Sequence, residues 1–433
     1  MYLFPPTLST LLLAAHFSRV NNDWLAIFCL ALPFILFVKK FWVKRVYQIL
    51  IILGGVIWIE RTVILVQMRE QAGEPWSRLA IILSVVALLT VLSALSFETK
   101  KAKSRFIKTD NESSPIVFSF ALTVLLLSFV HWKVAHPTML IAERFLPGTG
   151  WIEILLLAFY AAWITEKMLD IKKSSTIRKR IWTGFSFVFF SQFILGLAGF
   201  EKFLMTGKLH LPIPAVILAG PLYRGEGLFM LILFVGTVLF VGSAWCSHLC
   251  YVGAWDNLLA CSQKKPSALP RWRHGFRVGI LVFVLSAAMS LRYLGISGVV
   301  ATTLSVLFGL LGVGIMASFT RKKGAMVHCT VYCPTGLVAD WLGKVSPFRI
   351  HIDNNCDDCG ACTLACRYNA LEAENIQKRK AGITCSLCGD CLQSCSKEAI
   401  NYKLFRLKPK TARSVFIVLI VTLHAVFLGL ARL

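Results

Sequence analysis

The sequence is poor in charged residues, and poorest in acidic ones. Only 16% of its 433 residues are charged, and 22 Asp and Glu residues stand against 46 Lys and Arg residues. A typical soluble domain has about 25% charged residues and is less apolar, whereas 56% of this sequence is hydrophobic. The shortage of charge therefore argues against an ordinary soluble protein.

The beginning of the sequence lacks the basic segment that opens a secretory signal peptide. Residues Met1 to Phe17 are fairly apolar, but no basic residue precedes the apolar part. A cleaved signal peptide starts with a positively charged region. We therefore expect no cleaved signal here, and we expect this segment to lie in the membrane interface.

Long apolar runs are what the sequence has in abundance. A helix of about 20 apolar residues spans the hydrocarbon core of a bilayer. Ten runs approach or reach that length, at approximately 24–39, 46–67, 79–97, 115–131, 149–166, 181–200, 226–245, 276–295, 298–320 and 412–431. The sequence therefore predicts an α-helical integral membrane protein with about ten transmembrane helices.

The net charge of +24 could indicate nucleic-acid binding, but the basic residues are not spread over one soluble domain. They cluster in every second loop, at Lys39, Lys40, Lys44, Arg45, Lys100, Lys101, Lys103, Arg105, Lys108, Lys172, Lys173, Arg178, Lys179, Arg180, Lys264, Lys265, Arg271, Arg273, Arg321, Lys322 and Lys323. By the positive-inside rule these loops face the cytoplasm and both termini face outside. We expect a multi-pass protein of a bacterial-type inner membrane, in contact with lipid and not with nucleic acid.

Eight of the 14 cysteines form one motif that occurs twice. The pattern C-x2-C-x2-C-x3-C runs from Cys356 to Cys366 and again from Cys385 to Cys395. In the bacterial two-cluster ferredoxin arrangement, three cysteines of each run hold one [4Fe-4S] cluster and the fourth ligates the other cluster. This assigns the first cluster to Cys356, Cys359, Cys362 and Cys395, and the second cluster to Cys366, Cys385, Cys388 and Cys391.

The residues around these motifs fit a small α+β ferredoxin-like domain on the cytoplasmic side. Gly360 and Gly389 allow close approach of the backbone, and residues 348–353 and 399–403 are typical of short strands. A pair of zinc knuckles and a disulfide scaffold are the alternatives. Zinc sites use four ligands once, and disulfide scaffolds occur in small secreted domains, so both fit the interlocked runs less well.

A second signal is a pair of C-x3-C motifs, each at the cytoplasmic end of an apolar run. Cys246 and Cys250 form the first pair, and Cys329 and Cys333 form the second. If these stretches are α-helical, each pair lies at i and i+4 on one helical face. The four thiols could then bind a metal or a third cluster, or cycle as dithiols. Inert buried cysteines are the remaining alternative.

These motifs together resemble a known family. Residues 179–405 look like the polytopic membrane ferredoxins, which include the NapH subunit of periplasmic nitrate reduction, the NosR maturation protein and the copper-handling ferredoxin of cytochrome oxidase assembly. The shared order is a C-x3-C motif, two helices, a C-x3-C-P motif and a two-cluster ferredoxin. Tyr251 departs from the family, which usually has proline there. The resemblance implies quinol oxidation or electron relay to a partner oxidoreductase.

We therefore expect a membrane-bound protein that relays electrons between membrane quinone and a partner redox protein, possessing two [4Fe-4S] clusters and no haem, since no facing pair of histidines is evident. A maturation factor that reduces a metal or thiol of an extracytoplasmic metalloprotein is the first alternative, and a ferredoxin anchor for a cytoplasmic enzyme is the second. The expected regions are 1–110 (three helices), 111–178 (two helices), 179–345 (four helices with both C-x3-C motifs), 346–411 (ferredoxin) and 412–433 (a closing helix).

Overall fold

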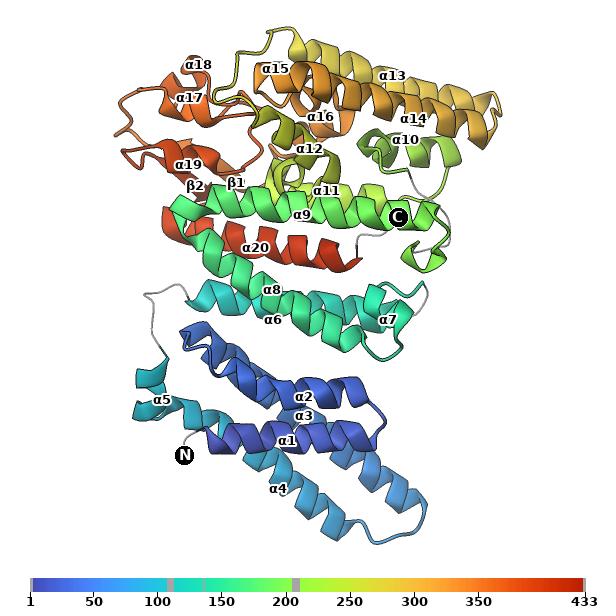
Figure 1. Cartoon of the computed structure of the whole chain (residues 1–433), viewed down its shortest axis with the longest axis vertical. Helices are drawn as coiled ribbons and strands as arrows, with labels where there is room; N and C mark the ends of the chain where they lie inside the picture. Colours follow the sequence, from blue (N-terminus) through green and yellow to red (C-terminus); the bar gives the residue numbers. More distant parts are fainter. Residues whose placement is uncertain (1–2, 107–112, 135–136, 205–210, 431–433) are drawn as a thin grey trace. The chain divides into compact units, whose positions relative to one another are not determined.

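The computed structural model describes residues 3–106, 113–134, 137–204 and 211–430 (Figure 1). The chain divides into two compact units, Met1–Ala162 and Trp163–Leu433. Regular structure in the described ranges is almost all helical, with one sheet of two strands. This confirms the predicted mainly helical architecture, while the division into five regions stays a prediction.

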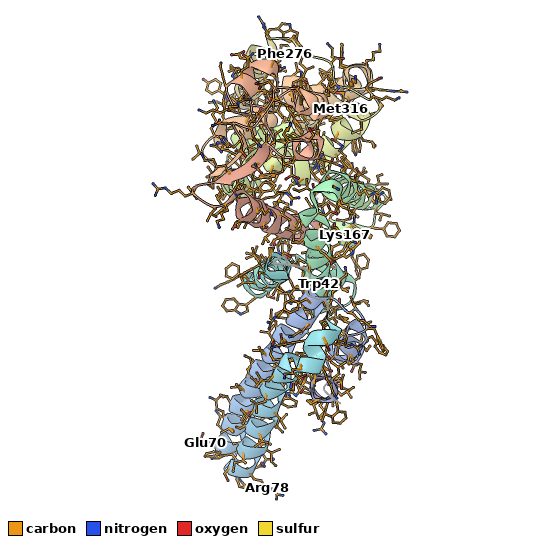
Figure 2. The ribbon with its side chains drawn as sticks, turned by 90° about the vertical axis from the view of Figure 1, so that its left-hand side faces the viewer. Trp42, Glu70, Arg78, Lys167, Phe276 and Met316 are labelled. Carbon is orange, nitrogen blue, oxygen red and sulfur yellow. The ribbon has the colours of Figure 1, made fainter. Side chains whose placement is uncertain are left out.

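The first unit is built from helices joined by short connections. They are α1 (Phe4–Arg19), α2 (Asp23–Ile35), α3 (Phe41–Gln71), α4 (Ser77–Ser93), a 3-10 turn (Ala94–Glu98), α5 (Lys100–Arg105), α6 (Ser113–Lys133), α7 (Ile141–Phe145) and the first part of α8 (Gly150–Leu169). Helices α3 and α4 form a hairpin, and Figure 2 shows Glu70 and Arg78 at its tip. Many large apolar side chains on this hairpin are exposed. Exposed apolar surface of this extent is typical of a face that meets lipid.

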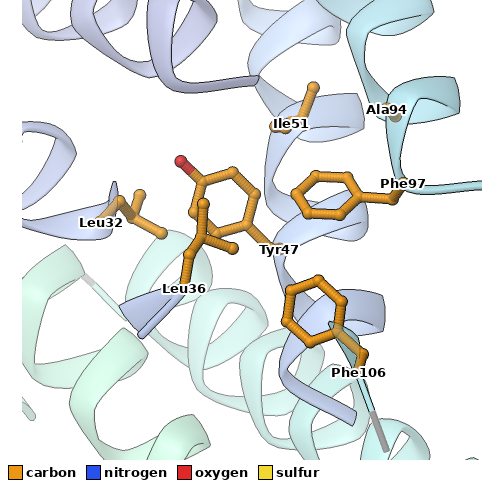
Figure 3. Packing of buried hydrophobic residues seen from close by; sticks show 7 residues of the cluster. All are labelled: Leu32, Leu36, Tyr47, Ile51, Ala94, Phe97 and Phe106. Carbon is orange, nitrogen blue, oxygen red and sulfur yellow. The ribbon is translucent and has the colours of Figure 1, made fainter. Parts of the chain in front are cut away.

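An aromatic core packs at the end of this hairpin opposite its tip. Tyr47 of α3 packs against Phe97, with ring centroids 5.6 Å apart, and Phe97 packs against Phe106 at 6.1 Å (Figure 3). Beside it, Glu98 accepts ion pairs from Lys44 at 3.2 Å and Lys103 at 3.3 Å. Lys44 is fully buried. It is counted among the basic residues that predict the orientation in the membrane, but it also neutralises the carboxylate of Glu98.

The second unit contains the cysteine motifs. Its helices are α9 (Ile171–Leu197), α10 (Pro214–Arg224), α11 (Phe229–Val241), α12 (Tyr251–Ala260), α13 (Arg273–Tyr293), α14 (Gly298–Ile315), α15 (Arg321–Lys323), α16 (Pro334–Leu342), α17 (Ala361–Ala365), α18 (Ala373–Gln377), α19 (Asp390–Ser394) and α20 (Pro409–Leu430). The 3-10 turns are Glu201–Phe203 and Gly242–Ala244, and the π-helical turns are Trp245–Leu249, Met316–Thr320 and His328–Tyr332.

Within the described residues, eight helices are long and apolar enough to cross a membrane. They are Phe41–Gln71, Ser77–Glu98, Ser114–Lys133, Ile171–Leu197, Phe229–Leu249, Arg273–Tyr293, Gly298–Lys323 and Pro409–Leu430. These eight coincide with eight of the ten predicted runs. The other two are α2, which is only 13 residues long and has Pro33 in its last turn, and α8, which carries Glu153, Glu166 and Lys167. The chain is thus of multi-pass membrane type, and the count of ten stays a prediction.

The two predicted strands are present and pair with each other. Strands β1 (Phe348–Ile352) and β2 (Ile400–Leu404) are antiparallel, with Phe348 opposite Leu404 and Ile352 opposite Ile400. Phe416 of α20 stacks on Tyr402 with ring centroids 4.6 Å apart and contacts Phe348 edge-on at 5.4 Å. Burying an aromatic side chain of this kind stabilises a fold by about 1.5–3 kcal/mol. The closing helix therefore fastens the small sheet to the helical part of this unit.

Figure 1 shows β1, β2, α17 and α19 gathered at one end of helices α9 and α20. That end carries three of the basic clusters. Arg273 donates to Glu372 at 2.9 Å, Arg367 donates to the carbonyl of Gly324 at 2.7 Å, and Gln393 donates to the carbonyl of Lys172 at 2.8 Å. The cysteine-rich module and these three predicted cytoplasmic loops therefore lie on the same side of the helices.

Candidate iron-sulfur sites

The two cysteine runs have the same backbone shape. Positive φ angles, which residues other than glycine rarely adopt, recur at matched positions in both runs. The matched pairs are Asp358 and Leu387, Gly360 and Gly389, and Asn369 and Glu398. Gly360 and Gly389 have φ angles of 72° and 78°, a conformation that favours glycine. A Cβ on Gly389 would also lie 2.7 Å from the Tyr402 hydroxyl, so the backbone approaches closely there as predicted.

The second half of the module encloses a cavity lined by four thiols. The cavity is small, with a volume of about 20 Å³, and its cysteines are Cys366, Cys385, Cys388 and Cys391. These are the four cysteines that the motif spacing assigns to the second cluster. Their neighbours in the wall include Ile350, Tyr368 and Leu371. A water-poor cavity lined by soft thiolate ligands is the environment that suits an iron-sulfur cluster.

Burial makes these thiols costly to ionise unless a cation is present. It raises the pKa of Cys366 to about 12, and the charge of Cys388 adds to the shift. Burial also raises the pKa of Cys385 and Cys391. A bound metal reverses this preference, because a coordinated thiol is deprotonated outright. The site is therefore suited to thiolates that hold metal and poorly suited to free thiolates.

The first half has the same spacing but a more open setting. Cys359 is exposed, Cys356 and Cys395 are half-buried, and Cys362 is buried. Burial raises the pKa of Cys362, and the charges of Cys356 and Cys395 raise it further. Three of the four predicted ligands of the first cluster are thus close enough to interact. Cys359 lies on the same loop.

A buried arginine that the sequence did not single out links the second half to the membrane helices. Arg178 of α9 is fully buried and donates to both carboxylate oxygens of Asp390, at 3.1 and 2.9 Å. It also donates to the carbonyl of Ser247 at 2.9 Å. The charge of Arg178 lowers the pKa of Cys388, against the larger effect of burial, which raises it. In the sequence, Arg178 is only one member of a basic cluster, and nothing in the sequence indicates that its side chain is buried.

The two C-x3-C motifs also share one local structure, but it is not the α-helix considered from their spacing. Each first cysteine lies in a π-helical turn, at Trp245–Leu249 and at His328–Tyr332. Each second cysteine has extended backbone and caps the next helix. Cys250 Sγ accepts from the backbone N–H of Gly253, and Cys333 Sγ accepts from that of Gly336, both at 3.4 Å. The prediction that each cysteine pair lies at i and i+4 on one α-helical face is therefore wrong, because the chain changes direction at the second cysteine.

The structure nevertheless brings the two motifs together. Asp256, six residues after Cys250, accepts a hydrogen bond from the backbone N–H of Cys329 at 2.9 Å. Burial raises the pKa of Cys329, and the charges of Asp256, Cys250, Cys333 and Cys246 raise it further. All four thiols thus lie within electrostatic reach of one another. Next to Cys333, Tyr332 lines an apolar groove of about 770 Å³ with Trp272, Phe276 and Phe308.

No single-metal site is evident in this arrangement. Across the described ranges, no three His, Cys, Asp or Glu side chains lie close enough together to hold one metal ion.

Comparison with known proteins supports iron-sulfur binding. The family model described as a 4Fe-4S binding domain matches residues 223–267 and 302–353, one segment around each C-x3-C motif. The protein named "Putative electron transport protein YccM" from Escherichia coli (strain K12) is 26% identical over 246 residues, which cover 49% of this chain and 65% of that protein. The alignment therefore spans less than two thirds of YccM.

Two archaeal proteins are also similar. "Uncharacterized protein MJ0750" from Methanocaldococcus jannaschii is 23% identical over 231 residues, covering 50% of this chain and 89% of that protein. "Uncharacterized protein MJ0749" from the same organism is 25% identical over 175 residues, covering 39% and 68%. No solved structure gives a significant match. Together, the matches support a ferredoxin family of membrane type and an electron-transfer role.

Proposed function

We propose that this protein relays electrons between membrane quinone and a partner redox protein through two [4Fe-4S] clusters. The observation that carries the proposal is the thiol-lined cavity of the second half, whose walls are hydrogen-bonded to the end of a membrane helix. Ser243 donates to the carbonyl of Cys385 at 2.5 Å, and Ser247 donates to that of Ser386 at 2.8 Å. When bound, such clusters accept and release single electrons at potentials set by burial, charge and hydrogen bonds.

In this proposal, the two halves of the module hold clusters with different roles. Cys366, Cys385, Cys388 and Cys391 hold the cluster next to the membrane helices, where burial excludes water. Cys356, Cys359, Cys362 and Cys395 hold the cluster toward solvent, and the exposure of Cys359 supports a docking side for the partner protein. The module faces the cytoplasm in this proposal, because it contacts loops that the positive-inside rule assigns to that side.

The apolar groove beside Tyr332 is the proposed quinone site. Its volume of about 770 Å³ falls within the range of small-molecule sites. Phe276 and Phe283 of α13, with Trp272 just before that helix, supply aromatic walls. Phe308 and Leu311 supply the α14 side. The Tyr332 ring stacks on Phe308 at 4.7 Å and is adjacent in sequence to Cys333. A quinone ring in this groove would therefore lie close to the C-x3-C thiols and within reach of lipid.

The experiment is cluster reduction by a short-chain quinol, followed by electron paramagnetic resonance on anaerobically purified protein. Gly279 lines the groove and has open space where a Cβ would stand, so Gly279→Leu fills the groove without a backbone clash. Gly314→Leu is the matched control, since Gly314 has the same open space on α14 but does not line the groove. We expect reduction to slow at least tenfold in Gly279→Leu and not in Gly314→Leu, with iron content unchanged in both.

Equal rates in both variants would remove the groove from the proposal. A native protein that contains no iron, or whose clusters neither accept electrons from quinol nor donate them to quinone, would overturn the proposed function itself. The two results differ in whether the clusters are present and active.

A further inference from the structure

The two C-x3-C motifs repeat one local arrangement that brings their four thiols near one another. In each motif a glycine of the following helix packs directly on the carbonyl of the first cysteine. A Cβ on Gly253 would lie 2.9 Å from the Cys246 oxygen, and a Cβ on Gly336 would lie 3.0 Å from the Cys329 oxygen. The glycines thus allow each capping helix to close over its π-helical turn. Two equivalent half-sites result, each with two thiols.

The half-sites are held against each other by buried polar contacts. Asp256 of the first motif accepts from the backbone of Cys329 at 2.9 Å and from Thr320 at 2.7 Å. Asp340 of the second motif pairs with Arg277 at 2.7 Å, and both side chains are buried. Arg277 also lies over Gly336, 2.9 Å from where its Cβ would stand. The first contact ties the first motif to the second, and the buried Arg277–Asp340 pair lies against the helix that follows the second motif.

The donor set formed by the four thiols suits an iron-sulfur cluster. They are soft ligands, which iron-sulfur centres prefer, and they lie close enough to interact electrostatically with one another. Both motifs also lie within the segments that the 4Fe-4S family model matches.

One tyrosine connects this group to the membrane-side cavity of the ferredoxin. Tyr368 lines that cavity, and its hydroxyl donates to the carbonyl of Cys246 at 3.2 Å. Tyr368 therefore contacts the first C-x3-C motif through its hydroxyl and borders the cavity that the second-cluster thiols line.

We propose that Cys246, Cys250, Cys329 and Cys333 together ligate a third [4Fe-4S] cluster, placed between the quinone groove and the second ferredoxin cluster. Neither segment matched by the 4Fe-4S family model could do this alone, since each C-x3-C motif supplies two ligands. The inference rests on the proposed electron-transfer function and extends it. It accounts for two contacts of these motifs: Tyr332 of the groove directly precedes Cys333, and Tyr368 of the cavity donates to the Cys246 carbonyl.

The experiment counts iron and acid-labile sulfide per chain after anaerobic purification, with spin quantitation of the fully reduced protein. We expect about twelve irons in the native protein, at four per [4Fe-4S] cluster. The Cys246→Ser/Cys329→Ser variant should retain about eight and lose one spin system. Cys261→Ser is the matched control, because Cys261 is exposed and lies within a matched segment. It should keep about twelve.

A native count near eight, with two spin systems, overturns the third cluster and leaves the proposed function standing. A native count near zero overturns both. If the double variant loses all of its iron through misfolding, the native iron count and number of spin systems still decide. Twelve irons with three spin systems support the proposal, and eight with two reject it.

Discussion

The two halves of the ferredoxin module share the same backbone conformation but have different surroundings. Both repeat the same cysteine spacing and the same positive φ positions. The second half is packed against α9 and the first C-x3-C turn, whereas the first half has the exposed Cys359 and partly open neighbours. Local sequence therefore fixes how each loop can wrap a cluster, and the tertiary neighbours fix what that cluster faces.

The ion pairs of the two halves differ in the same way. Asp390, beside Cys391, is buried against Arg178, while Asp358, between Cys356 and Cys359, pairs with a partly exposed Arg379. Exposed pairs contribute about 0–1 kcal/mol. Removing one partner of a buried pair costs about 3–5 kcal/mol, because the other charge is left buried and unpaired. Substitutions in matched positions of the two halves should therefore have unequal effects.

The largest difference is expected between Cys388→Ser and Cys359→Ser. Each variant should lose about four irons, since each removes one ligand of one cluster. Cys388→Ser should also abolish reduction of the first cluster by quinol, because the proposed route from the membrane to that cluster passes the second half. Cys359→Ser should leave quinol reduction of the buried cluster intact. Spectroscopy of both variants after quinol addition tests this, and equal losses of reduction would refute the assigned order of the two clusters.

Breaking the buried ion pair should affect stability more than breaking the exposed one. Asp390→Asn should lower the free energy of unfolding of the second unit by about 3–5 kcal/mol, whereas Asp358→Asn should leave it nearly unchanged because water screens an exposed pair. Thermal unfolding of the iron-loaded protein in detergent measures both. If the two variants are equally stable, the burial of the Arg178–Asp390 pair is not maintained in the membrane protein.

The Arg178–Asp390 pair should affect the reduction potential of the second cluster and not that of the first. Arg178→Met removes a positive charge near Cys388 and should lower the reduction potential of the second cluster by roughly 60 mV, a tenfold change in a one-electron equilibrium. Asp390→Asn removes a negative charge and should raise that potential. A purely structural role would shift both variants in the same direction. Redox-poised spectroscopy separates the two interpretations, with the first cluster as the internal control.

Much of this site could be predicted from spacing. The C-x2-C-x2-C-x3-C runs point to the four thiols that line the cavity, and the flanking segments predicted both strands. The positions of Arg178 and Tyr368 could not be predicted, because a charge pattern marks which end of a helix is basic and not which residue turns inward. The π-helical turns were missed because a C-x3-C spacing looks the same in an α-helix until the chain bends at Cys250 and Cys333.

The same limit applies to the membrane helices. The apolar runs located eight helices that are long enough to span a bilayer. Hydropathy alone could not show that α2 ends at Ile35, soon after Pro33, or that Glu98 neutralises Lys44 within a cluster that counts as positive. Runs of apolar residues predict where a helix can lie, whereas its length and its charge balance depend on what packs against it.

The smallest effect concerns how the buried half is joined to the C-x3-C turn. Tyr368→Phe removes the hydrogen bond to the Cys246 carbonyl, which is worth about 1 kcal/mol. Tyr402→Phe is the matched control, since its hydroxyl is also buried near the second cluster but donates to Leu387 at 2.7 Å. In hydrogen exchange, Tyr368→Phe should speed exchange of the peptide 242–252 about fivefold, and Tyr402→Phe should speed exchange only around Leu387. If Tyr402→Phe loosens the peptide 242–252 as much, the buried half moves as one block and Tyr368 does not specifically connect it to the C-x3-C thiols.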